Sequence, residues 1–450
     1  MCDRDAELKM FFDYARESYQ PLSAELYDKY DVKRGLRRRD GTGVMAGLTS
    51  IGDVKGYYIE DGEKIPCEGR LRYRGIDVRD LVAGCQAEGR FGFEETAFLL
   101  LFGQLPSASM LARFNAFLSG KRRLPDGFAE DMIMKAPSVN IMNKLARCVL
   151  ASYSYDANPD DTSLNNILRQ SLELIARFPT MAAYGYQAKR HYHDGQSLYL
   201  HAPQPELSTA ENFLYMLRMD NQYTKSEAEI LDLALILHAE HGGGNNSAFA
   251  TRVLASSGTD TYSAISAAVG SLKGPRHGGA NEKVMGMIAD FYENLTDITD
   301  EKQISDHIAR LLRGESYDHS GLVYGMGHAI YTLSDPRQVL LKEKARELAI
   351  EKNMYEEFLL YDAIERLTPA IFAEVKKDNK VMCANVDLYS GFVYKMLGIP
   401  PELYTPLFAI SRIAGWCAHR IEEIIANRKI IRPAYKSVVH SRPYVPLAKR

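Results

Sequence analysis

The chain has 450 residues, 46% of them hydrophobic and 25% charged, which is the balance of a globular protein with a large core and room for two domains. Its 55 basic and 58 acidic residues leave a net charge of −3, so no overall field attracts nucleic acid. No run of about eighteen uninterrupted apolar residues occurs, and we therefore expect no membrane span.

The cysteines are scattered through the chain without the CxxC pairs or finger spacing of a metal site. In a chain of this length they indicate buried thiols in a reducing compartment, not a disulfide framework. The first residues, MCDRDAELKM, are charged early and lack the apolar run of a secretory signal. We therefore expect a cytoplasmic protein.

The first elements in chain order are short and polar. Residues 1–45 form a polar extension that ends in a basic run at residues 33–39 (KRGLRRR), which we expect to be a solvated arm able to contact an anion. Residues 48–75 hold short β-type runs split by Gly, Asp and Pro, and these predict one or two small hairpins. Beyond this region the chain is expected to be helical.

Helical spacing of apolar residues dominates the rest of the chain. It recurs in FEETAFLLLF, SLNNILRQSLELIARF, AENFLYMLRM and SEAEILDLALILHAEH, and again after Asn281, a candidate helix cap. Ser334 or Asp335 followed by Pro336 predicts another helix start. No strands of period two alternate with these helices, so we predict a mostly α fold and not a parallel-sheet α/β fold.

Residues 262–274 (YSAISAAVGSLKG) are dense in small side chains, which let a neighbouring helix approach closely. This helix should end at Gly274 and lead into GPRHGGAN, where His277 lies among glycines. Two interpretations are open. The segment is either a glycine-rich turn with a stray histidine, or a site where backbone and imidazole reach a ligand together.

Three histidines, His241, His277 and His328, each lie beside glycine or in a polar context. Taken singly, each is as well explained by a hydrogen-bonded core residue. Together they favour a ligand site, because glycine permits close backbone approach and a neutral imidazole can donate to a developing oxyanion. His238 and His241 share a helical face, but no Cys or Asp cluster completes a metal ligand set, so we expect no metal.

A carboxylate and several arginines also lie in apolar surroundings. Burial of Asp387 in CANVDLYSGFVYKMLGIPP would raise its pKa and suit a general base; the alternative is an N-cap for a helix beginning at Tyr389. Arg337, Arg412 and Arg432 either form internal ion pairs or clamp ligand carboxylates. Together, the candidate base, the imidazoles and the arginines indicate carbon–carbon bond formation between an enolised partner and a keto acid.

At these residues the sequence resembles the citrate synthase family. GPRHGGANE, MGHAIYTLSDPR, NVDLYSGFVYKMLGIPPELYTPLFAISRIAGWCAH and IRP follow its motifs in order, and RLRYRGIDVRDL and FEETAFLLLFGQLP match its N-terminal portion. The resemblance covers about residues 45–440. It implies an almost all-α homodimer with an active site in the cleft between a large domain (46–278 and 391–450) and a smaller mobile one (279–390), after an extension at 1–45.

The resemblance also implies roles for single residues. Asp387 would abstract a methyl proton from acetyl-CoA, His277 would donate a hydrogen bond to the resulting enol, and His328 would polarise the oxaloacetate carbonyl. Citryl-CoA would then be hydrolysed to citrate and CoA. No cofactor beyond the CoA substrate is implied.

Further positions match the family's substrate contacts. Oxaloacetate would be held by His241, Arg337 and Arg412, and by Arg432 from the other subunit of the homodimer. The candidates for contact with CoA are Arg74, Lys273, Arg276 and Lys395. The family's basic residues near Ala329 and Thr332 are absent here, which leaves the contacts to the CoA phosphates open.

Alternative functions remain beside si-type citrate synthase. A 2-methylcitrate synthase would use propionyl-CoA with the same catalytic set, and one methylene changes binding by only ~1–3 kcal/mol. A non-catalytic helical dimer predicts a broken catalytic set, whereas every member is present. The related domain of a citrate-cleaving lyase would need fused CoA-ligase-like segments, which 450 residues do not hold.

Overall fold

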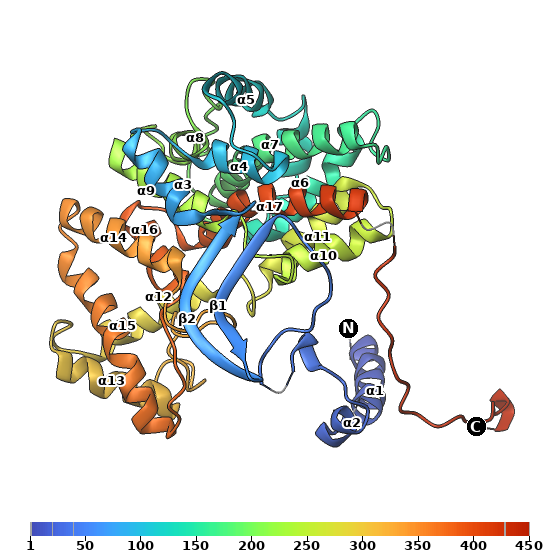
Figure 1. Ribbon diagram of the computed structural model, residues 1–450. Helices are drawn as coiled ribbons and strands as arrows, with labels where there is room; N and C mark the ends of the chain where they lie inside the picture. Colours follow the sequence, from blue (N-terminus) through green and yellow to red (C-terminus); the bar gives the residue numbers. More distant parts are fainter. Residues whose placement is uncertain (1, 20, 39, 427–428, 450) are drawn as a thin grey trace. The chain divides into compact units, whose positions relative to one another are not determined.

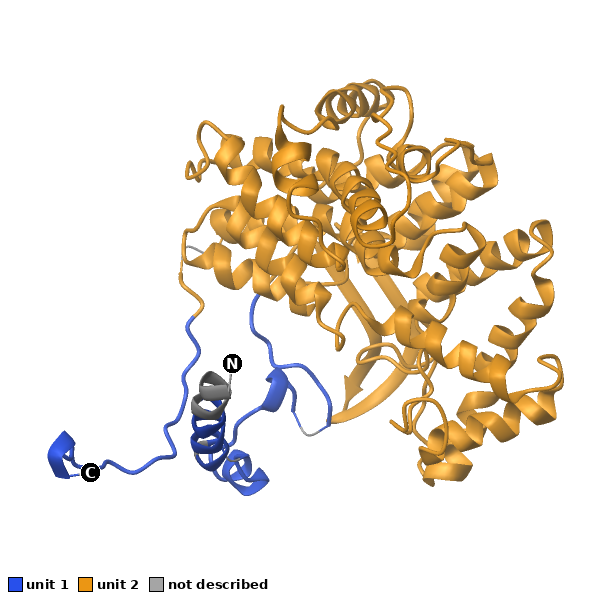
Figure 2. Cartoon of the chain, turned by 180° about the vertical axis from the view of Figure 1, so that it is seen from behind, with its two compact units in different colours: residues 1–47, 432–450 blue, residues 48–431 orange. Residues whose placement is uncertain are grey.

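The computed structural model describes residues 2–19, 21–38, 40–426 and 429–449, without the side chains of residues 2–7 and 18. The chain divides into two compact units (Figure 2). Unit 1 comprises Met1–Gly47 and Arg432–Arg450, and unit 2 comprises Leu48–Ile431.

Unit 1 contains the predicted N-terminal extension. Its elements are α1 (Cys2–Ser18), α2 (Ala24–Lys29), a short 3₁₀ turn η1 (Arg34–Leu36) and, near the chain end, η5 (Leu447–Lys449). Most of its described side chains are exposed, as expected for a solvated segment, although part of the segment is helical. Arg39, the last residue of the predicted basic run, lies outside the described residues.

Unit 2 begins with the predicted hairpin. Strand β1 (Gly52–Glu60) pairs antiparallel with β2 (Glu63–Tyr73), which also pairs with the short β3 (Ile76–Asp77). Asp61 and Gly62 turn the hairpin with positive φ angles of 49° and 83°, the geometry of a tight two-residue connection. The prediction of hairpin structure within residues 48–75 is confirmed.

Nine α-helices follow between residues 78 and 273 in this described part of the chain, and α4, α7, α8, α9 and α11 match predicted segments. They are α3 (Val78–Ala87), α4 (Phe93–Phe102), α5 (Ala108–Lys121), α6 (Ile141–Ser152), α7 (Leu164–Tyr192), α8 (Thr209–Leu217), α9 (Lys225–His238), α10 (Asn246–Ser256) and α11 (Thr261–Lys273), with a π-helical turn η2 (Ala129–Met134) and a 3₁₀ turn η3 (Tyr153–Tyr155). The small residues of α11 pack against α6 and α10, and the helix ends at Gly274 as predicted.

Helix α17 (Tyr404–Ala426) is the centre of this helical layer, preceded by the 3₁₀ turn η4 (Pro401–Leu403) (Figure 1). It packs against α4, α7, α9, α10 and α11, and every residue from 404 to 421 is buried. A helix surrounded by other helices must be apolar or internally paired on all faces. The polar residues of α17 are therefore positioned by the core.

A second group of helices comprises α12 (Ala280–Asn294), α13 (Glu301–Arg313), α14 (Pro336–Glu351), α15 (Tyr355–Lys376) and α16 (Val386–Met396). They pack mainly on one another, and α14 also contacts α9 and α3 (Figure 1). The predicted division into residues 46–278 with 391–450 and residues 279–390 stays a prediction, because residues 48–431 form one compact unit.

Two predicted helix starts have different outcomes. Asp335 caps α14, accepting the Arg337 N–H at 3.0 Å, as predicted. The prediction that Asn281 caps α12 is wrong, because Gly279 already accepts the first helical bond from the Lys283 N–H and the helix begins at Ala280. Asn281 is instead buried in the first turn.

The state of the described cysteines agrees with the prediction of buried thiols without a disulfide framework. The described cysteines Cys67, Cys85, Cys148, Cys383 and Cys417 are free, and all but Cys67 are buried. Burial raises the pKa of the Cys148 and Cys417 thiols to about 12, so these buried thiols are protonated at neutral pH. The side chain of Cys2 lies outside the described residues.

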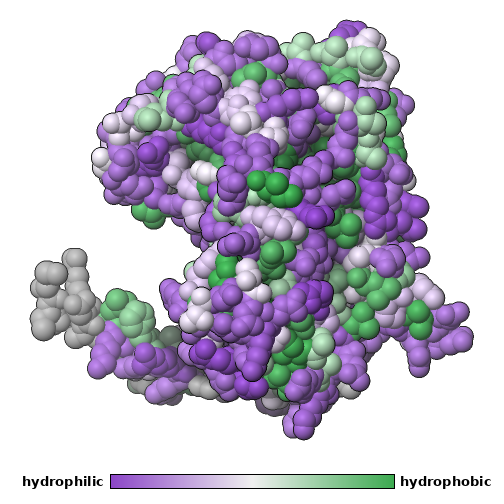
Figure 3. Space-filling view, turned by 90° about the vertical axis from the view of Figure 1, so that its left-hand side faces the viewer, coloured by the Kyte–Doolittle hydropathy of each residue, from purple (hydrophilic) through white to green (hydrophobic). Residues whose placement is uncertain are grey.

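The face in Figure 3 is mostly hydrophilic, with hydrophobic residues in small groups. Scattered exposed apolar residues of this kind are normal on a folded protein. Throughout the described ranges, no helix combines the length and hydropathy needed to cross a bilayer.

Candidate active site

His277 lies in the turn that joins α11 to α12. The turn is closed by hydrogen bonds from the His277 N–H to Gly274 O (2.9 Å) and from the Gly278 N–H to Leu272 O (3.0 Å). A Cβ atom on Gly278 would lie 2.3 Å from Leu272 O and 2.9 Å from the Thr405 side chain. Glycine is therefore required where the turn passes α17, and this close packing explains the glycine-rich sequence.

The ring of His277 is oriented by α10. Its Nε2 lies 3.1 Å from the hydroxyl of Ser247, which also accepts a hydrogen bond from Trp416 Nε1 at 3.0 Å. This contact leaves Nδ1 for a ligand. Burial, assisted by the charge of Arg412, lowers the pKa of His277 to about 4, so the ring is neutral at pH 7.

The tautomer of His328 follows from its hydrogen bonds. Nδ1 accepts the backbone N–H groups of Ile330 (3.0 Å) and Tyr331 (3.1 Å). An accepting nitrogen carries no proton, so in the neutral ring the proton is on Nε2. His328 thus presents an N–H donor at Nε2, the group needed to polarise a carbonyl oxygen.

The loop that carries His328 is held by the β1–β2 hairpin. The Thr332 hydroxyl donates to the carbonyls of Gly56 and Cys67, and Ser334 Oγ accepts the Gly69 N–H at 3.1 Å. A Cβ atom on Gly56 would lie 2.5 Å from Tyr331 Cα, so the loop fits only against glycine. The buried Thr332 therefore anchors the loop at one of the positions where the resemblance suggested a basic residue.

His241 comes three residues after the end of α9 and faces His328. The ring centroids of His241 and His328 are 5.2 Å apart, and Tyr331 lies 5.6 Å from His241. His241 is buried, and its Nε2 has no hydrogen-bond partner in the described part of the chain. Burial and the charge of Arg337 hold the pKa of His241 well below its ordinary value, so the ring is neutral.

The two arginines of this region have different partners. Arg337 donates from Nε and Nη2 to the buried carboxylate of Asp335 at 3.0 and 2.7 Å, so the internal ion pair considered for it is present. Arg412 donates from Nε to His238 O at 2.5 Å and stacks over Phe408 at 4.7 Å, but it forms no ion pair with a described residue. Its buried Nη1 also lacks a partner, which leaves this side of the guanidinium for a ligand carboxylate.

Asp387 lies in the first turn of α16. The helix is capped by Asn385, whose side chain accepts the Asp387 N–H at 3.0 Å, and it begins at Val386. The alternative that Asp387 caps a helix starting at Tyr389 is therefore wrong. Burial raises the pKa of the Asp387 carboxyl group to about 6, although the charge of Arg337 opposes the shift. The raised pKa fits a general base.

Six predicted residues thus belong to one electrostatic cluster. Besides burial, charges within the set contribute to the pKa shifts of its members, together with those of Asp335 and Glu240 outside it. The set comprises His241, His277, His328, Arg337, Asp387 and Arg412. Arg432 is different: it is exposed and belongs to unit 1, so its place in a partner's site stays a prediction.

The candidates for CoA contact lie in two kinds of surroundings. The Arg74 guanidinium donates to Leu100 O (3.0 Å) and Ser50 Oγ (2.7 Å), and Lys395 pairs with Glu357 (2.6 Å). These three contacts give both cations partners within the protein. Lys273 and Arg276 are exposed beside the His277 turn, where a phosphate can reach them. Contact of these candidates with CoA stays a prediction.

Sequence reasoning missed several contributors to this site. Asp335 was expected only as a helix cap, although the SDPR spacing also places its carboxylate on Arg337. Tyr331, whose ring lies 4.7 Å from His328, and Ser247, which contacts His277, carry no recognisable signal in the sequence. In the described part of the chain, no group of three His, Cys, Asp or Glu residues is arranged to hold a metal ion.

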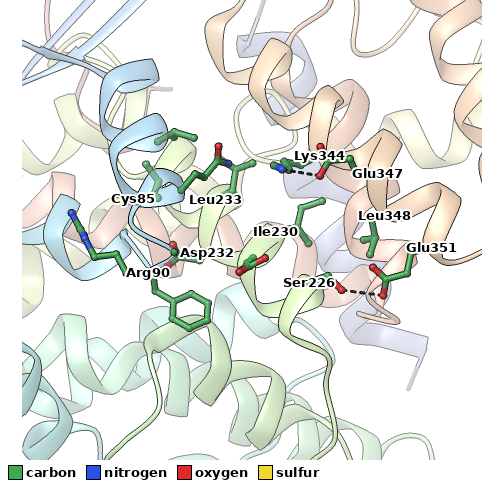
Figure 4. Close-up of a pocket in the computed structure, with 16 residues that line it drawn as sticks. Cys85, Arg90, Ser226, Ile230, Asp232, Leu233, Lys344, Glu347, Leu348 and Glu351 are labelled. Atoms are coloured by element: carbon green, nitrogen blue, oxygen red, sulfur yellow. Dashed lines mark hydrogen bonds and ion pairs between the residues drawn. The ribbon is translucent and has the colours of Figure 1, made fainter.

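A cavity of about 240 Å³ lies apart from these groups, between α3, α9 and α14 (Figure 4). Several of its polar groups are already paired: Ser226 with Glu351 at 3.0 Å and Lys344 with Glu347 at 2.7 Å. Asp232 accepts the backbone N–H groups at the start of α4. We assign this cavity no part in the chemistry of the site.

The fold and the site define an α-helical protein in which imidazoles, arginines and a carboxylate lie in one electrostatic cluster. The family described as "Citrate synthase, C-terminal domain" matches residues 39–434. A citrate synthase of Acidithiobacillus ferridurans is 35% identical over 418 residues, covering 91% of this chain and 97% of that protein. A 2-methylcitrate synthase of Shewanella oneidensis is 33% identical over 381 residues, covering 84% and 92%.

Solved structures show the same similarity. A ternary complex of citrate synthase from Thermoplasma acidophilum with carboxymethyl coenzyme A and oxaloacetate superimposes with a TM-score of 0.72 at 27% identity, covering 90% of this chain and 97% of that one. The chain belongs to the citrate synthase family, and its mostly α, citrate synthase-like fold is as predicted.

Proposed function

We propose that the protein condenses acetyl-CoA with oxaloacetate and hydrolyses citryl-CoA to citrate and CoA. The observation that carries the proposal is a half-buried carboxylate of raised pKa, Asp387, in one cluster with neutral imidazoles and arginines. Two of the cluster's buried polar atoms, His241 Nε2 and Arg412 Nη1, lack partners among the described residues. Buried polar atoms of this kind are normally satisfied, and an oxaloacetate carboxylate would satisfy both.

The geometry supports a sequence of steps. Asp387 takes a proton from the methyl group of acetyl-CoA, and His277 donates a hydrogen bond to the enol oxygen. The enol carbon attacks the carbonyl of oxaloacetate, which His328 polarises through its Nε2 proton, and the resulting alkoxide takes that proton to form the hydroxyl group of citryl-CoA. Water then cleaves the thioester of citryl-CoA. These steps need proton transfer and charge stabilisation, so we propose no metal and no cofactor beyond the CoA substrate.

We further propose that the active form is a homodimer in the cytoplasm. A dimer would let Arg432 reach the partner's oxaloacetate, as the family resemblance implies. Arg432 is exposed and forms no ion pair with a described residue, and both observations support this assignment. Sedimentation of the purified protein tests the oligomeric state.

The main alternative function differs in the acyl group of the CoA substrate. Relatives named citrate synthase and 2-methylcitrate synthase match this chain at similar identity.

We expect acetyl-CoA to be preferred over propionyl-CoA. One methylene in an apolar pocket is worth ~1–3 kcal/mol, so the ratio of kcat/KM should reach about 10-fold. Release of free CoA thiol from each acyl-CoA with oxaloacetate, at matched subsaturating concentrations, measures this ratio. Parity or a propionyl preference would make the protein a dual-specificity or 2-methylcitrate synthase, and no thiol release from either would refute the proposed condensation.

His277→Ala should lower kcat by about 10²-fold or more, because the enol loses its hydrogen-bond donor. The change removes a half-buried ring from a turn, so the melting temperature is measured beside the rate. His319→Ala is the control, since His319 is an exposed histidine whose Nδ1 lies 2.9 Å from the Gly314 carbonyl oxygen. Wild-type turnover in a folded His277→Ala enzyme would remove this residue from the mechanism.

A further inference from the structure

Glu240 is a fully buried carboxylate to which the proposed reaction gives no role. Its Oε1 accepts hydrogen bonds from the Gly242 N–H (2.5 Å) and from His419 Nε2 (2.9 Å). Its Oε2 has no partner in the described part of the chain. Burying a carboxylate with only half of its acceptors satisfied costs free energy, so the residue needs a functional reason.

His419, on α17, is oriented as a donor toward Glu240. Its Nδ1 accepts from Arg252 Nε (3.2 Å) and Nη2 (2.7 Å). Since arginine has no acceptor, Nδ1 carries no proton and the ring proton is on Nε2, facing Glu240. Arg252 is itself fixed by the carboxylates of Glu422 and Glu423, the latter at 2.9 Å.

Two glycines make room for the Glu240 carboxylate. A Cβ atom on Gly52 of β1 would lie 2.7 Å from Oε1, and one on Gly415 of α17 would lie 2.6 Å from Oε2. Gly415 would also bring its Cβ within 2.4 Å of Ala239 O. Strand, helix and loop therefore enclose the carboxylate without side chains between them.

Glu240 acts on two groups that face the site. Its Oε1 accepts the Gly242 N–H, so this hydrogen bond closes a short loop around His241. Together with the positive φ of Gly242 (83°), it fixes the backbone of His241 and thereby the position of its imidazole ring. Its charge also attracts Arg412, and it is the strongest influence that favours the charged guanidinium against burial. No ion pair joins the two residues, so Glu240 supplies charge without occupying the free Nη1 of Arg412.

We propose that Glu240, oriented by His419, is a positioning residue for dicarboxylate binding. It holds His241 in place and keeps Arg412 charged and open. This inference rests on the proposed function, in which His241 and Arg412 bind oxaloacetate.

The test compares Glu240→Gln with the wild-type enzyme in the thiol-release assay. Glutamine keeps the shape of the side chain and removes its charge. We expect KM for oxaloacetate to rise at least about tenfold while KM for acetyl-CoA changes less than about twofold. Glu240→Asp keeps the charge and should recover part of the affinity. Glu229→Gln is the matched control, because Glu229 is an exposed carboxylate on α9 outside the site.

A second pair of variants keeps the inference testable if Glu240→Gln does not fold. His419→Gln retains an N–H donor for Glu240 and an acceptor for Arg252, and His419→Leu retains neither. We expect KM for oxaloacetate to rise in the leucine variant and to stay within about threefold of wild type in the glutamine variant. A structural role alone would lower the melting temperature without this split between substrates.

The outcomes separate the two proposals. A wild-type enzyme inactive with oxaloacetate refutes the proposed function. An active wild-type enzyme whose Glu240→Gln and His419→Leu variants bind oxaloacetate normally overturns the positioning role of Glu240 and leaves the proposed function intact.

Discussion

Asp387→Asn should lower kcat by at least about 10²-fold, because the amide cannot accept the methyl proton of acetyl-CoA. Asn is nearly isosteric with Asp and removes a charge that burial already disfavours. The melting temperature should therefore be unchanged or slightly higher than that of the wild type. Thiol release at saturating substrates, measured beside a thermal unfolding curve, separates the catalytic effect from a folding defect.

The pH dependence of the wild-type enzyme provides an independent check on this role. Burial raises the pKa of Asp387 to about 6, and only the ionised carboxylate can act as a base. Activity should therefore be full above that pKa and fall as the pH drops through about 6. Asp362→Asn is the control, because Asp362 is paired with Lys342 on the surface of α15. This variant should keep the wild-type rate and the same loss of activity at low pH. A near-normal rate in Asp387→Asn would assign the base to another group.

Arg412→Lys should raise KM for oxaloacetate at least about 30-fold, the ratio that corresponds to ~2 kcal/mol. Lysine keeps a positive charge but loses the planar fork that can bind a carboxylate through two parallel bonds. It also loses the hydrogen bond to His238 O and the stacking on Phe408. KM for acetyl-CoA should change much less, because the arginine faces the dicarboxylate. Steady-state titration of each substrate at a saturating level of the other measures both values.

Arg420→Lys on the same helix is the matched control for this substitution. Arg420 is also fully buried, and it donates to the Thr261 hydroxyl (3.0 Å) and to Thr259 O (2.8 Å) instead of facing the site. Its replacement should cost stability and leave KM for oxaloacetate unchanged. If the two variants raised this KM equally, the effect of Arg412→Lys would reflect damage to α17 and not lost substrate contact.

The sequence alone determined the fold class, the hairpin near residues 48–75 and about half of the helices of unit 2. These are local properties, since helical spacing, caps such as Asp335 and a turn such as Asp61–Gly62 act over a few residues. The motifs also selected His277, His328 and Asp387, because a titratable group in a glycine-rich or apolar run is locally unusual. The start of α12 was misplaced because the turn after Gly274 sets it, and local spacing does not contain that turn.

Only the tertiary structure decided which of these side chains lie close together and which of them already have a partner within the protein. Arg337 and Arg412 look alike in the sequence, yet Arg337 is paired with Asp335 and Arg412 keeps a free Nη1. Glu240 and His419 are 179 residues apart, and nothing local predicts their hydrogen bond. The physical reason is that charge state, tautomer and free donors depend on burial and on partners from distant segments, which a linear pattern does not record.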